Sequence, residues 1–442
     1  MDKFIIRGGN PLVGTVRVSG AKNSALPSMA AAILSEEEIT LENIPQVRDI
    51  ETQGRLLASM GASVTLHDGD AWDHVTISCR SLSDPVARYE IVKTMRASSL
   101  VLGPLIARAG VARVAMPGGC AIGGRPIDMH IKGLEKMGAV IRQEHGYLEA
   151  RVDSRVGRLR GAHIVFDRIT VTGTEDLLMA AVLAEGDTLL ENCAREPEVV
   201  DLAALLTAMG AKIQGAGTST IHVHGVTTLH GARYRINPDR IEAGTLLIAG
   251  AITGGDLIVA NCNTDHLGAV IEKLRETGVR VEVLGPDAVR VHGGERLRAA
   301  DISTEEYPGF PTDMQAQYMA LATQAEGVSL VRENIFENRF MHVQELVRMG
   351  ANIKVDGNTA SVRGPARLSS AAVMCSDLRA SASLVLAALV ADGESVVDRV
   401  YHMDRGYEHI EDKLCGVGAQ IQRLGNVFVP RQEKPSSLNQ PT

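Results

Sequence analysis

One short segment, residues 116–126, combines a thiol and a guanidinium group with four glycines. Four glycines within seven residues disfavour helix and strand, so we predict a loop with little side-chain bulk. Cys120 lies in this loop, and Arg125 stands just before a helical pattern over residues 127–137. A reactive group on a loop, followed by a cation at a helix start, is typical of a lid over an anionic substrate. The alternative is a surface turn with an idle cysteine, and this segment alone does not separate the two.

Five further cations stand at or near predicted helix starts: Lys22, Arg96, Arg339, Arg379 and Arg405. The helix macrodipole favours acidic residues there, so each cation costs a few tenths to about 1 kcal/mol. A bound anion, held by arginine forks and free backbone N–H groups, would offset this cost. We therefore predict a polyanionic substrate between two lobes, although each cation taken alone is more often a solvated surface charge.

At other predicted helix starts the residue is acidic, and most of these acidic residues follow the dipole rule. Glu175, Glu196, Glu242 and Asp265 are interpreted as structural residues of this kind. Asp313, next to the predicted cations, has two interpretations. It caps the helix that follows, or it accepts a proton from a substrate hydroxyl.

The elements that must position these residues recur six times along the chain. A helical pattern ends at a glycine in each copy, where a left-handed C-cap is expected. The glycines are 68 to 77 residues apart: Gly61, Gly138, Gly210, Gly278, Gly350 and Gly418. Short alternating strands follow each glycine, as in residues 212–215 and 221–224.

Each unit also contains an alanine- and leucine-rich segment, whose small apolar residues all round predict a helix buried on every side. The segments are residues 25–34, 97–107, 176–184, 244–252, 314–324 and 380–390. We predict an α/β protein of six repeated units, three in each of two lobes. A stacked solenoid is disfavoured because its terminal repeats would be atypical and polar.

Composition excludes several classes of function. The 442 residues suffice for two domains. A net charge of −8 and an aromatic content of 3% argue against nucleic acid or an acidic membrane as partner. No apolar run has membrane-spanning length, and the six cysteines lack paired spacing, which suits a soluble cytoplasmic protein.

Motifs for common cofactors are missing as well. No P-loop is present, and Gly215 and Gly217 lie in a predicted hairpin rather than between strand and helix. His222 and His224 alternate on one strand without an evident third ligand. We therefore predict neither a metal nor a cofactor.

Six separated motifs resemble one known family. They are residues 19–24, the Cys120 loop, and residues 309–313, 336–340, 376–379 and 404–407. In these the chain resembles the enolpyruvyl transferases of the UDP-N-acetylglucosamine 1-carboxyvinyltransferase family. The resemblance implies a two-lobed inside-out α/β barrel with buried helices inside and sheets outside. It implies a first domain of residues 22–235 and a second of residues 1–21 and 236–442. Residues 431–442 are expected to form a disordered tail, and the protein is expected to be a monomer.

The resemblance also implies a reaction. The family transfers the enolpyruvyl group of phosphoenolpyruvate to the 3′-hydroxyl of UDP-N-acetylglucosamine and releases phosphate, the first step of peptidoglycan synthesis. The residues implied at the phosphoenolpyruvate are Lys22, Asn23, Arg125, Arg379 and Arg405. Those implied at the UDP-sugar are Asn23, Arg96, Arg125, Pro126, Ile127, Asp128, Met129, Arg168, Ile169, Thr170, Val171, Thr172, Asp313 and Ile335.

Four residues have implied catalytic roles: Cys120, Asp313, Lys22 and Arg405. Asp313 would accept the hydroxyl proton. Cys120 would act as an acid toward the vinyl carbon or form a thioether adduct with phosphoenolpyruvate, and its presence implies sensitivity to fosfomycin. Two alternatives stay open: a transferase of the enolpyruvylshikimate-phosphate synthase type, and a non-catalytic repeat protein that binds a nucleotide sugar.

Overall fold

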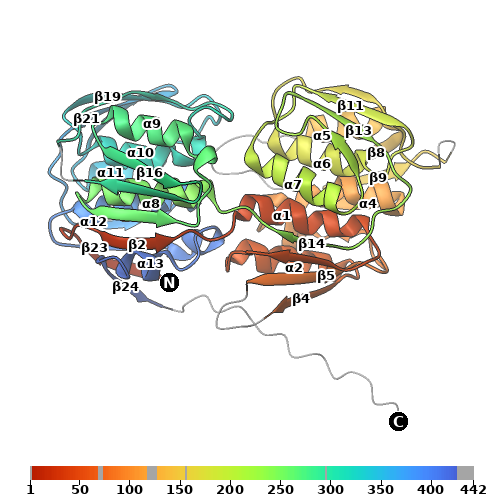
Figure 1. Cartoon of the computed structure of the whole chain (residues 1–442), viewed down its shortest axis with the longest axis horizontal. Helices are drawn as coiled ribbons and strands as arrows, with labels where there is room; N and C mark the ends of the chain where they lie inside the picture. The colour runs from red at the N-terminus through yellow and green to blue at the C-terminus, as the bar shows by residue number, and fades with distance from the viewer. Residues whose placement is uncertain (1, 68–72, 117–126, 155–156, 294–295, 426–442) are drawn as a thin grey trace, which may run out of the picture.

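The computed structural model describes residues 2–67, 73–116, 127–154, 157–293 and 296–425. The predictions for Cys120, Arg125, Pro126 and the tail at residues 431–442 lie outside these ranges. The chain forms two lobes that lie side by side (Figure 1). Among the described helices, none has the length and apolar character needed to cross a membrane.

Six four-stranded sheets with one shared pattern build the two lobes. In each sheet a lead strand pairs in parallel with the second strand, and the second, third and fourth strands pair antiparallel. The sheets of the first lobe are β14 (Ala232–Arg235), β3 (Ile39–Glu42), β5 (His74–Ser78) and β4 (Ser63–His67); β6 (Val86–Ala87), β7 (Val111–Ala115), β9 (Tyr147–Val152) and β8 (Ala139–Glu144); and β10 (His163–Val165), β11 (Asp187–Glu191), β13 (Thr220–His224) and β12 (Lys212–Gln214). Those of the second lobe are β2 (Val13–Arg17), β15 (Asp256–Ala260), β17 (Ala288–His292) and β16 (Arg280–Gly285); β18 (Ile302–Ser303), β19 (Gly327–Arg332), β21 (Thr359–Gly364) and β20 (Asn352–Asp356); and β22 (Ala372–Met374), β23 (Glu394–Asp398), β1 (Lys3–Arg7) and β24 (Gln420–Leu424).

The two ends of the described chain meet in one sheet. Strand β1 lies between β23 and β24, and β2 leads the sheet that contains β15. The chain therefore starts in the second lobe, crosses to the first after β2, and returns after β14 (Figure 1). Each lobe has its own hydrophobic core, one formed by residues 21–236 and the other by residues 4–18 and 241–419.

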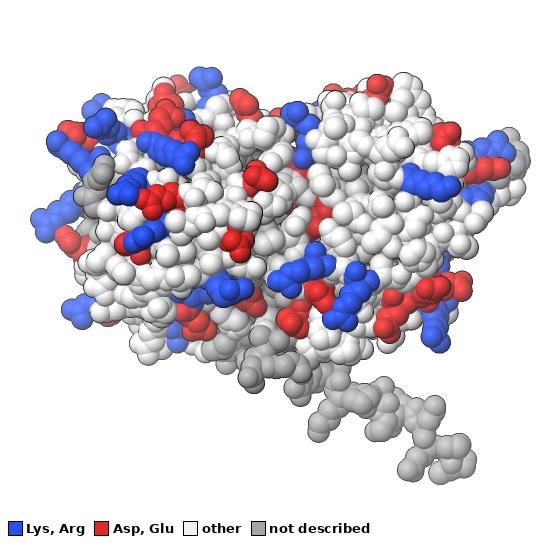
Figure 2. Space-filling model, viewed as in Figure 1, with Lys and Arg blue, Asp and Glu red and all other residues white. Residues whose placement is uncertain are grey.

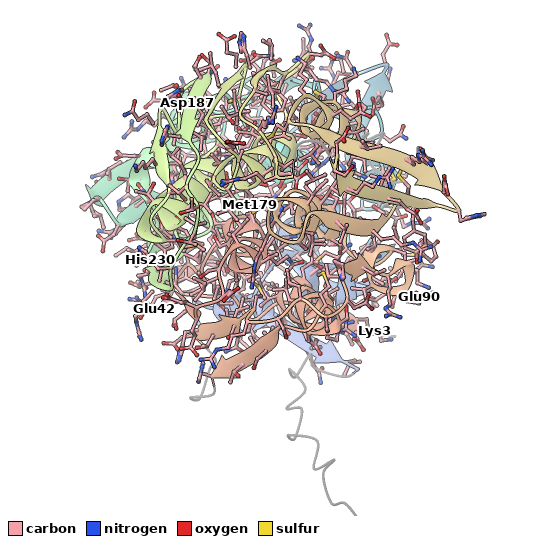
Figure 3. The ribbon with its side chains drawn as sticks, turned by 90° about the vertical axis from the view of Figure 1, so that its right-hand side faces the viewer. Lys3, Glu42, Glu90, Met179, Asp187 and His230 are labelled. Atoms are coloured by element: carbon pink, nitrogen blue, oxygen red, sulfur yellow. The ribbon has the colours of Figure 1, made fainter. Side chains whose placement is uncertain are left out.

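A helix buried on nearly all sides runs through each unit, as predicted. These inner helices are α1 (Lys22–Ala31) with the 3₁₀ turn η1 (Ala32–Leu34); η2 (Arg96–Val101) with α4 (Leu102–Ala109); α6 (Val171–Ala181); α8 (Arg240–Ile252); η4 (Thr312–Met314) with α10 (Gln315–Ala322); and α12 (Leu378–Val390). In the second lobe α8, α10 and α12 pack against one another, and in the first lobe α6 packs against α1 and α4. Figure 3 looks into the first lobe, where Met179 of α6 lies at the centre while Glu42, Glu90, Asp187 and His230 lie around the edge.

A second helix in each unit precedes the repeated glycine. These helices are α2 (Arg48–Ser59), α5 (Asp128–Lys136), α7 (Pro197–Ala208), α9 (Gly268–Glu276), α11 (Val343–Arg348) and α13 (Ile410–Cys415). All six glycines have a positive φ, from 88° at Gly278 to 111° at Gly418, which confirms the left-handed C-caps. Three short elements complete the fold: α3 (Tyr89–Val92), η3 (Thr264–His266) and η5 (Val400–Arg405). The predicted two-lobed α/β architecture of six units is confirmed.

Several inner helices begin earlier than the apolar pattern predicts. Helix α6 begins at Val171 rather than near Asp176, because the Thr170 side chain caps it by accepting a hydrogen bond from the Gly173 N–H at 3.2 Å. Helix α1 begins at Lys22, which confirms the predicted cation at its start, three residues before the apolar segment at residues 25–34. The first turns of these helices carry polar residues, so a helix start predicted from the apolar pattern alone lies about one turn too far along the chain.

Candidate functional site

One buried carboxylate joins two predicted cations from opposite lobes. Asp49 lies in the first turn of α2 and Lys22 is the first residue of α1, both in the first lobe. The Lys22 Nζ lies 3.2 Å from the Asp49 Oδ2. From the second lobe, Arg405 at the end of η5 places its Nε 3.0 Å from the Asp49 Oδ1 and its Nη2 3.5 Å from the Oδ2. The structure thus brings Lys22 and Arg405 together around a single anion.

Arg379 belongs to the same electrostatic environment. Burial lowers the pKa of Lys22, Asp49 raises it, and Arg379 and Arg405 both lower it; the net direction is downward. Three cations from α1, α12 and η5 are therefore close enough to repel one another. A second anion placed among them would relieve this repulsion.

A second carboxylate, Asp313, lies between two buried arginines. The Arg339 Nη2 is 2.8 Å from the Asp313 Oδ1, and the Arg379 Nε is 3.3 Å from the Oδ2. The 3₁₀ turn η4 begins after Pro311 and α10 begins after Met314, so Asp313 caps neither element. The interpretation of Asp313 as a helix cap is wrong. Its side chain instead faces the cations predicted at two other helix starts.

Asn23 and Arg96 lie in neighbouring first turns. Asn23 follows Lys22 in α1, and Arg96 is the first residue of η2, which packs against both α1 and α6. Both residues are half-buried. They come from the first lobe, as do the predicted residues on α5 and α6.

The predicted UDP-sugar residues of the first lobe gather at the starts of α5 and α6. Ile127 precedes α5, Asp128 and Met129 form its first turn, and Arg168, Ile169, Thr170, Val171 and Thr172 lead into α6. A buried histidine connects the two helices. The His130 Nδ1 lies 3.0 Å from the Asp176 Oδ2, and its Nε2 lies 3.4 Å from the Thr172 Oγ1. Asp176 also accepts a hydrogen bond from the Gly103 N–H at 2.7 Å, so α4, α5 and α6 share one polar contact.

Ile335 follows strand β19 in the second lobe and is half-buried. Its N–H donates to the Glu333 carboxylate at 2.9 Å. The same carboxylate accepts a hydrogen bond from Thr312, the residue before Asp313. Ile335 and Asp313, both implied at the UDP-sugar, are therefore joined through one side chain.

Two of the acidic residues interpreted as ordinary helix-start residues, Glu175 and Glu196, lie with Glu198 in a buried cluster at the junction of the lobes, whereas Glu242 and Asp265 lie in the first turns of α8 and η3 as interpreted. Glu198 of α7 pairs with Arg240 of α8 through contacts of 3.0 and 3.3 Å. Burial raises the pKa of Glu175 well above its usual range, and Glu198 and Glu196 raise it further. The interpretation of Glu175 as a helix-start residue is wrong, because α6 begins at Val171 and its first turn contains no acidic residue. Acidic and basic side chains lie side by side along the junction of the lobes (Figure 2).

Three residues at this site carry no signal that sequence reasoning could detect: Asp49, His130 and Glu333. Asp49 obeys the dipole rule for a helix start, so nothing in its position marks it as a partner of two cations. His130 and Glu333 lie within or beside ordinary helical and strand patterns. Among the described residues, no group of three or more histidine, cysteine, aspartate or glutamate side chains is arranged to hold a metal ion.

Comparison with known proteins decides the family. The EPSP synthase model, described as 3-phosphoshikimate 1-carboxyvinyltransferase, matches residues 6–414. The chain belongs to this family. A UDP-N-acetylglucosamine 1-carboxyvinyltransferase from Acidobacterium capsulatum is 76% identical over 98% of both chains. One from Koribacter versatilis is 67% identical over 99% of this chain and 100% of its own. The resemblance found in the sequence motifs is therefore confirmed.

Solved structures agree with this family membership. The enolpyruvyl transferase NikO from Streptomyces tendae superposes with a TM-score of 0.85 at 27% identity, over 96% of this chain and 98% of its own. An EPSP synthase from Acinetobacter baumannii superposes with a TM-score of 0.73 at 18% identity, over 96% and 100%. The second likeness shows the fold alone. This member of the EPSP synthase family is a carboxyvinyltransferase enzyme.

Proposed function

We propose that this enzyme transfers the enolpyruvyl group of phosphoenolpyruvate to the 3′-hydroxyl of UDP-N-acetylglucosamine and releases phosphate, as the first step of peptidoglycan synthesis. The names of the relatives at 76% and 67% identity support this substrate pair. The observation that carries the proposal is the meeting of Lys22 and Arg405, from opposite lobes, at the Asp49 carboxylate.

Phosphoenolpyruvate binds among Lys22, Asn23, Arg379 and Arg405 in this proposal, with Arg125 from the segment outside the described residues. Phosphoenolpyruvate carries a carboxylate and a phosphate. The contacts of Asp49 with Lys22 and Arg405 support a site at which cations from both lobes bind a carboxylate. When phosphate leaves, the same cations stabilise the negative charge that develops on it. No metal or cofactor takes part in this scheme.

The UDP-sugar binds at the starts of the first-lobe helices and at the second-lobe residues Asp313 and Ile335. Its first-lobe partners are Asn23, Arg96, Arg125, Pro126, Ile127, Asp128, Met129, Arg168, Ile169, Thr170, Val171 and Thr172. Asp313 accepts the proton of the 3′-hydroxyl, and Arg339 and Arg379 hold its two oxygens in a fixed orientation. Its position at an inner-helix start, between two buried arginines, supports this role.

The reaction adds the sugar oxygen to the enol carbon and then eliminates phosphate. The first step needs a proton on the neighbouring carbon, and Cys120 supplies it or forms a thioether with phosphoenolpyruvate. Cys120 is also the residue that fosfomycin would modify. The lobes correspond to two domains, residues 22–235 and residues 1–21 with 236–442, in a cytoplasmic monomer.

A phosphate-release assay with product mass measurement tests the proposal. Phosphate should appear only when phosphoenolpyruvate and UDP-N-acetylglucosamine are both present, and the nucleotide sugar should gain the mass of one enolpyruvyl group. Release that depends on shikimate 3-phosphate would favour the enolpyruvylshikimate-phosphate synthase alternative. Binding of the nucleotide sugar without any phosphate release would favour the non-catalytic alternative.

A further inference from the structure

The carboxylate of Glu333 is a buried acceptor for four donors from three chain segments. Glu333 is the residue directly after β19, and it is only 3% exposed. The Oε1 accepts from the Thr304 Oγ1 at 2.9 Å and from the backbone N–H groups of Ile335 and Phe336 at 2.9 and 3.2 Å. The Thr312 Oγ1 lies 3.0 Å from both carboxylate oxygens. Hydrogen bonds to a buried charged acceptor are stronger than those between neutral groups, so this cluster fixes the segments firmly.

Two of these donors are connected to Asp313, one directly along the chain and one through Arg339. Thr312 directly precedes Asp313 in η4, so fixing its hydroxyl fixes the start of the turn that carries the Asp313 carboxylate. The ring of Phe336 lies 5.3 Å from the Arg339 guanidinium, which in turn binds Asp313 at 2.8 Å. The Glu333 carboxylate therefore fixes Thr312, which precedes Asp313, and the backbone of Phe336, whose ring contacts Arg339.

The third donor, Ile335, extends the same cluster toward the expected UDP-sugar contact. Its backbone N–H points at Glu333, which leaves the position of Ile335 dependent on this carboxylate. One buried side chain thus sets the relative placement of Asp313 and Ile335, which belong to different segments of the second lobe.

We propose that Glu333 is a positioning residue for the acceptor half of the reaction. It aligns Asp313 with the sugar hydroxyl and Ile335 with the nucleotide sugar, and it has no contact with phosphoenolpyruvate. This inference rests on the proposed function. Because a small displacement of a proton acceptor lowers the rate of transfer strongly, loss of the Glu333 contacts lowers turnover even though Glu333 does not touch the reacting atoms.

Two variants of the Thr312 hydroxyl and one of the Glu333 carboxylate test this role. Thr312→Val removes the donor shared by both oxygens, whereas Thr312→Ser keeps it. Glu333→Gln keeps one carbonyl oxygen for the backbone donors but removes the charge. Thr323→Val is the matched control, because Thr323 is also buried and lies just after the other end of α10. Its hydroxyl donates to the Ala320 carbonyl at 2.7 Å and accepts from the side chain of its neighbour Gln324 at 3.0 Å, so both hydrogen bonds are local.

Kinetic constants per folded molecule are the readout, with the folded fraction taken from thermal unfolding. We expect Thr312→Val to lower kcat by about tenfold or more, as a displaced catalytic group does, and Glu333→Gln to raise the KM for UDP-N-acetylglucosamine as well. The KM for phosphoenolpyruvate should stay within about twofold. Thr312→Ser and Thr323→Val should match the wild type.

Other outcomes overturn the inference. Thr312→Val and Glu333→Gln with wild-type kcat and KM at equal folded fraction would mean that the cluster is structural only. Equal changes in the KM of both substrates would mean that Glu333 has no preference for the acceptor half. A wild-type enzyme that releases no phosphate with UDP-N-acetylglucosamine would instead overturn the proposed function, and the inference with it, before any variant is compared.

Discussion

At the scale of single residues, two carboxylates organise the site, and each of them binds two cations that come from different helices or turns. Lys22, Arg339, Arg379 and Arg405 break the dipole rule at predicted helix starts, and the structure brings them to Asp49 and Asp313. Asp49 could not be found in the same way, because an acidic residue at a helix start has an ordinary local explanation. Asp49 becomes a partner of Arg405 only because α2 of the first lobe lies against η5 of the second lobe.

The buried histidine His342, which lies close to Arg339, predicts a pH effect on stability. Burial lowers the pKa of His342 from 6.5 to about 4, with Asp377 raising it and Arg339 lowering it. The folded state therefore favours the neutral ring, whereas the unfolded chain binds a proton below pH 6.5. The free energy of unfolding should fall as the pH drops from about 6.5 to 4, by up to about 3 kcal/mol from this group.

Urea unfolding of the wild type and of His342→Gln at several pH values between 7 and 4 measures this contribution. The variant should lose less stability than the wild type over the interval. His222→Gln serves as the control, since His222 lies on the exposed face of β13 and its ion pair with Asp187 is exposed on both sides, where such pairs contribute little to stability. Identical pH dependence for the wild type and His342→Gln would contradict the expectation.

At the scale of helices and strands, sequence periodicity predicts which elements exist, but the apolar pattern alone starts the inner helix α6 too late. The apolar pattern starts α6 near Asp176, whereas the Thr170 cap starts it at Val171. The difference matters for function, because it moves Val171 and Thr172 from a loop into a helix first turn. Polar first turns lack the apolar signal on which the prediction depends.

The close approach of α4 to α6 gives a prediction at this scale. A Cβ at Gly103 would lie 2.3 Å from the backbone oxygen of Asp176, a contact that backbone atoms cannot relieve cheaply. Gly103→Ala should therefore lower the free energy of unfolding by about 1–3 kcal/mol, as overpacking does. Chemical denaturation provides the measurement.

Gly268→Ala is the matched control for this substitution. Gly268 begins α9, has no positive φ, and would place an added Cβ in open space with no atom within 4 Å. Alanine should therefore be neutral or slightly stabilising there. A Gly103→Ala protein as stable as the Gly268→Ala protein would show that the two helices can move apart without cost.

At the scale of the whole molecule, the repeat predicts two lobes but not the exchange of strands between the chain's two ends. The six glycines mark six units, yet β1 pairs with β23 and β24 and β2 leads the sheet of β15. Pairing between distant segments has no local signal, so the repeat count alone could not assign the first strands. The family resemblance supplied that information.

At the contact between the lobes, one buried ion pair is expected to contribute strongly to the free energy of unfolding. Arg240 of α8 binds Glu198 of α7 at 3.0 Å, close to Glu175 and Glu196. Arg240→Met leaves the Glu198 carboxylate without its ion-pair partner and Glu196 without a nearby cation, and should lower the free energy of unfolding by about 3–5 kcal/mol. Removing the charge of Glu198 as well, by Glu198→Gln, should restore part of the loss.

Arg296→Met is the surface control, because the ion pair of Arg296 with Glu326 is exposed on both sides and contributes little. Denaturant titration of the wild type and the three variants compares them. Equal stability of the Arg240→Met and Arg296→Met proteins would contradict the importance of the buried pair.

The most direct measurement of the central claim is a double-mutant cycle on Lys22 and Arg405, with kcat/KM for phosphoenolpyruvate as the readout. If both cations hold one anion across the junction of the lobes, Lys22→Met and Arg405→Met should each lower this constant at least about tenfold. Their effects should be non-additive by about 0.5–3 kcal/mol, and the KM for UDP-N-acetylglucosamine should change much less. Additive losses, together with equal changes in the KM of both substrates, would contradict the claim that the two lobes share one anion site.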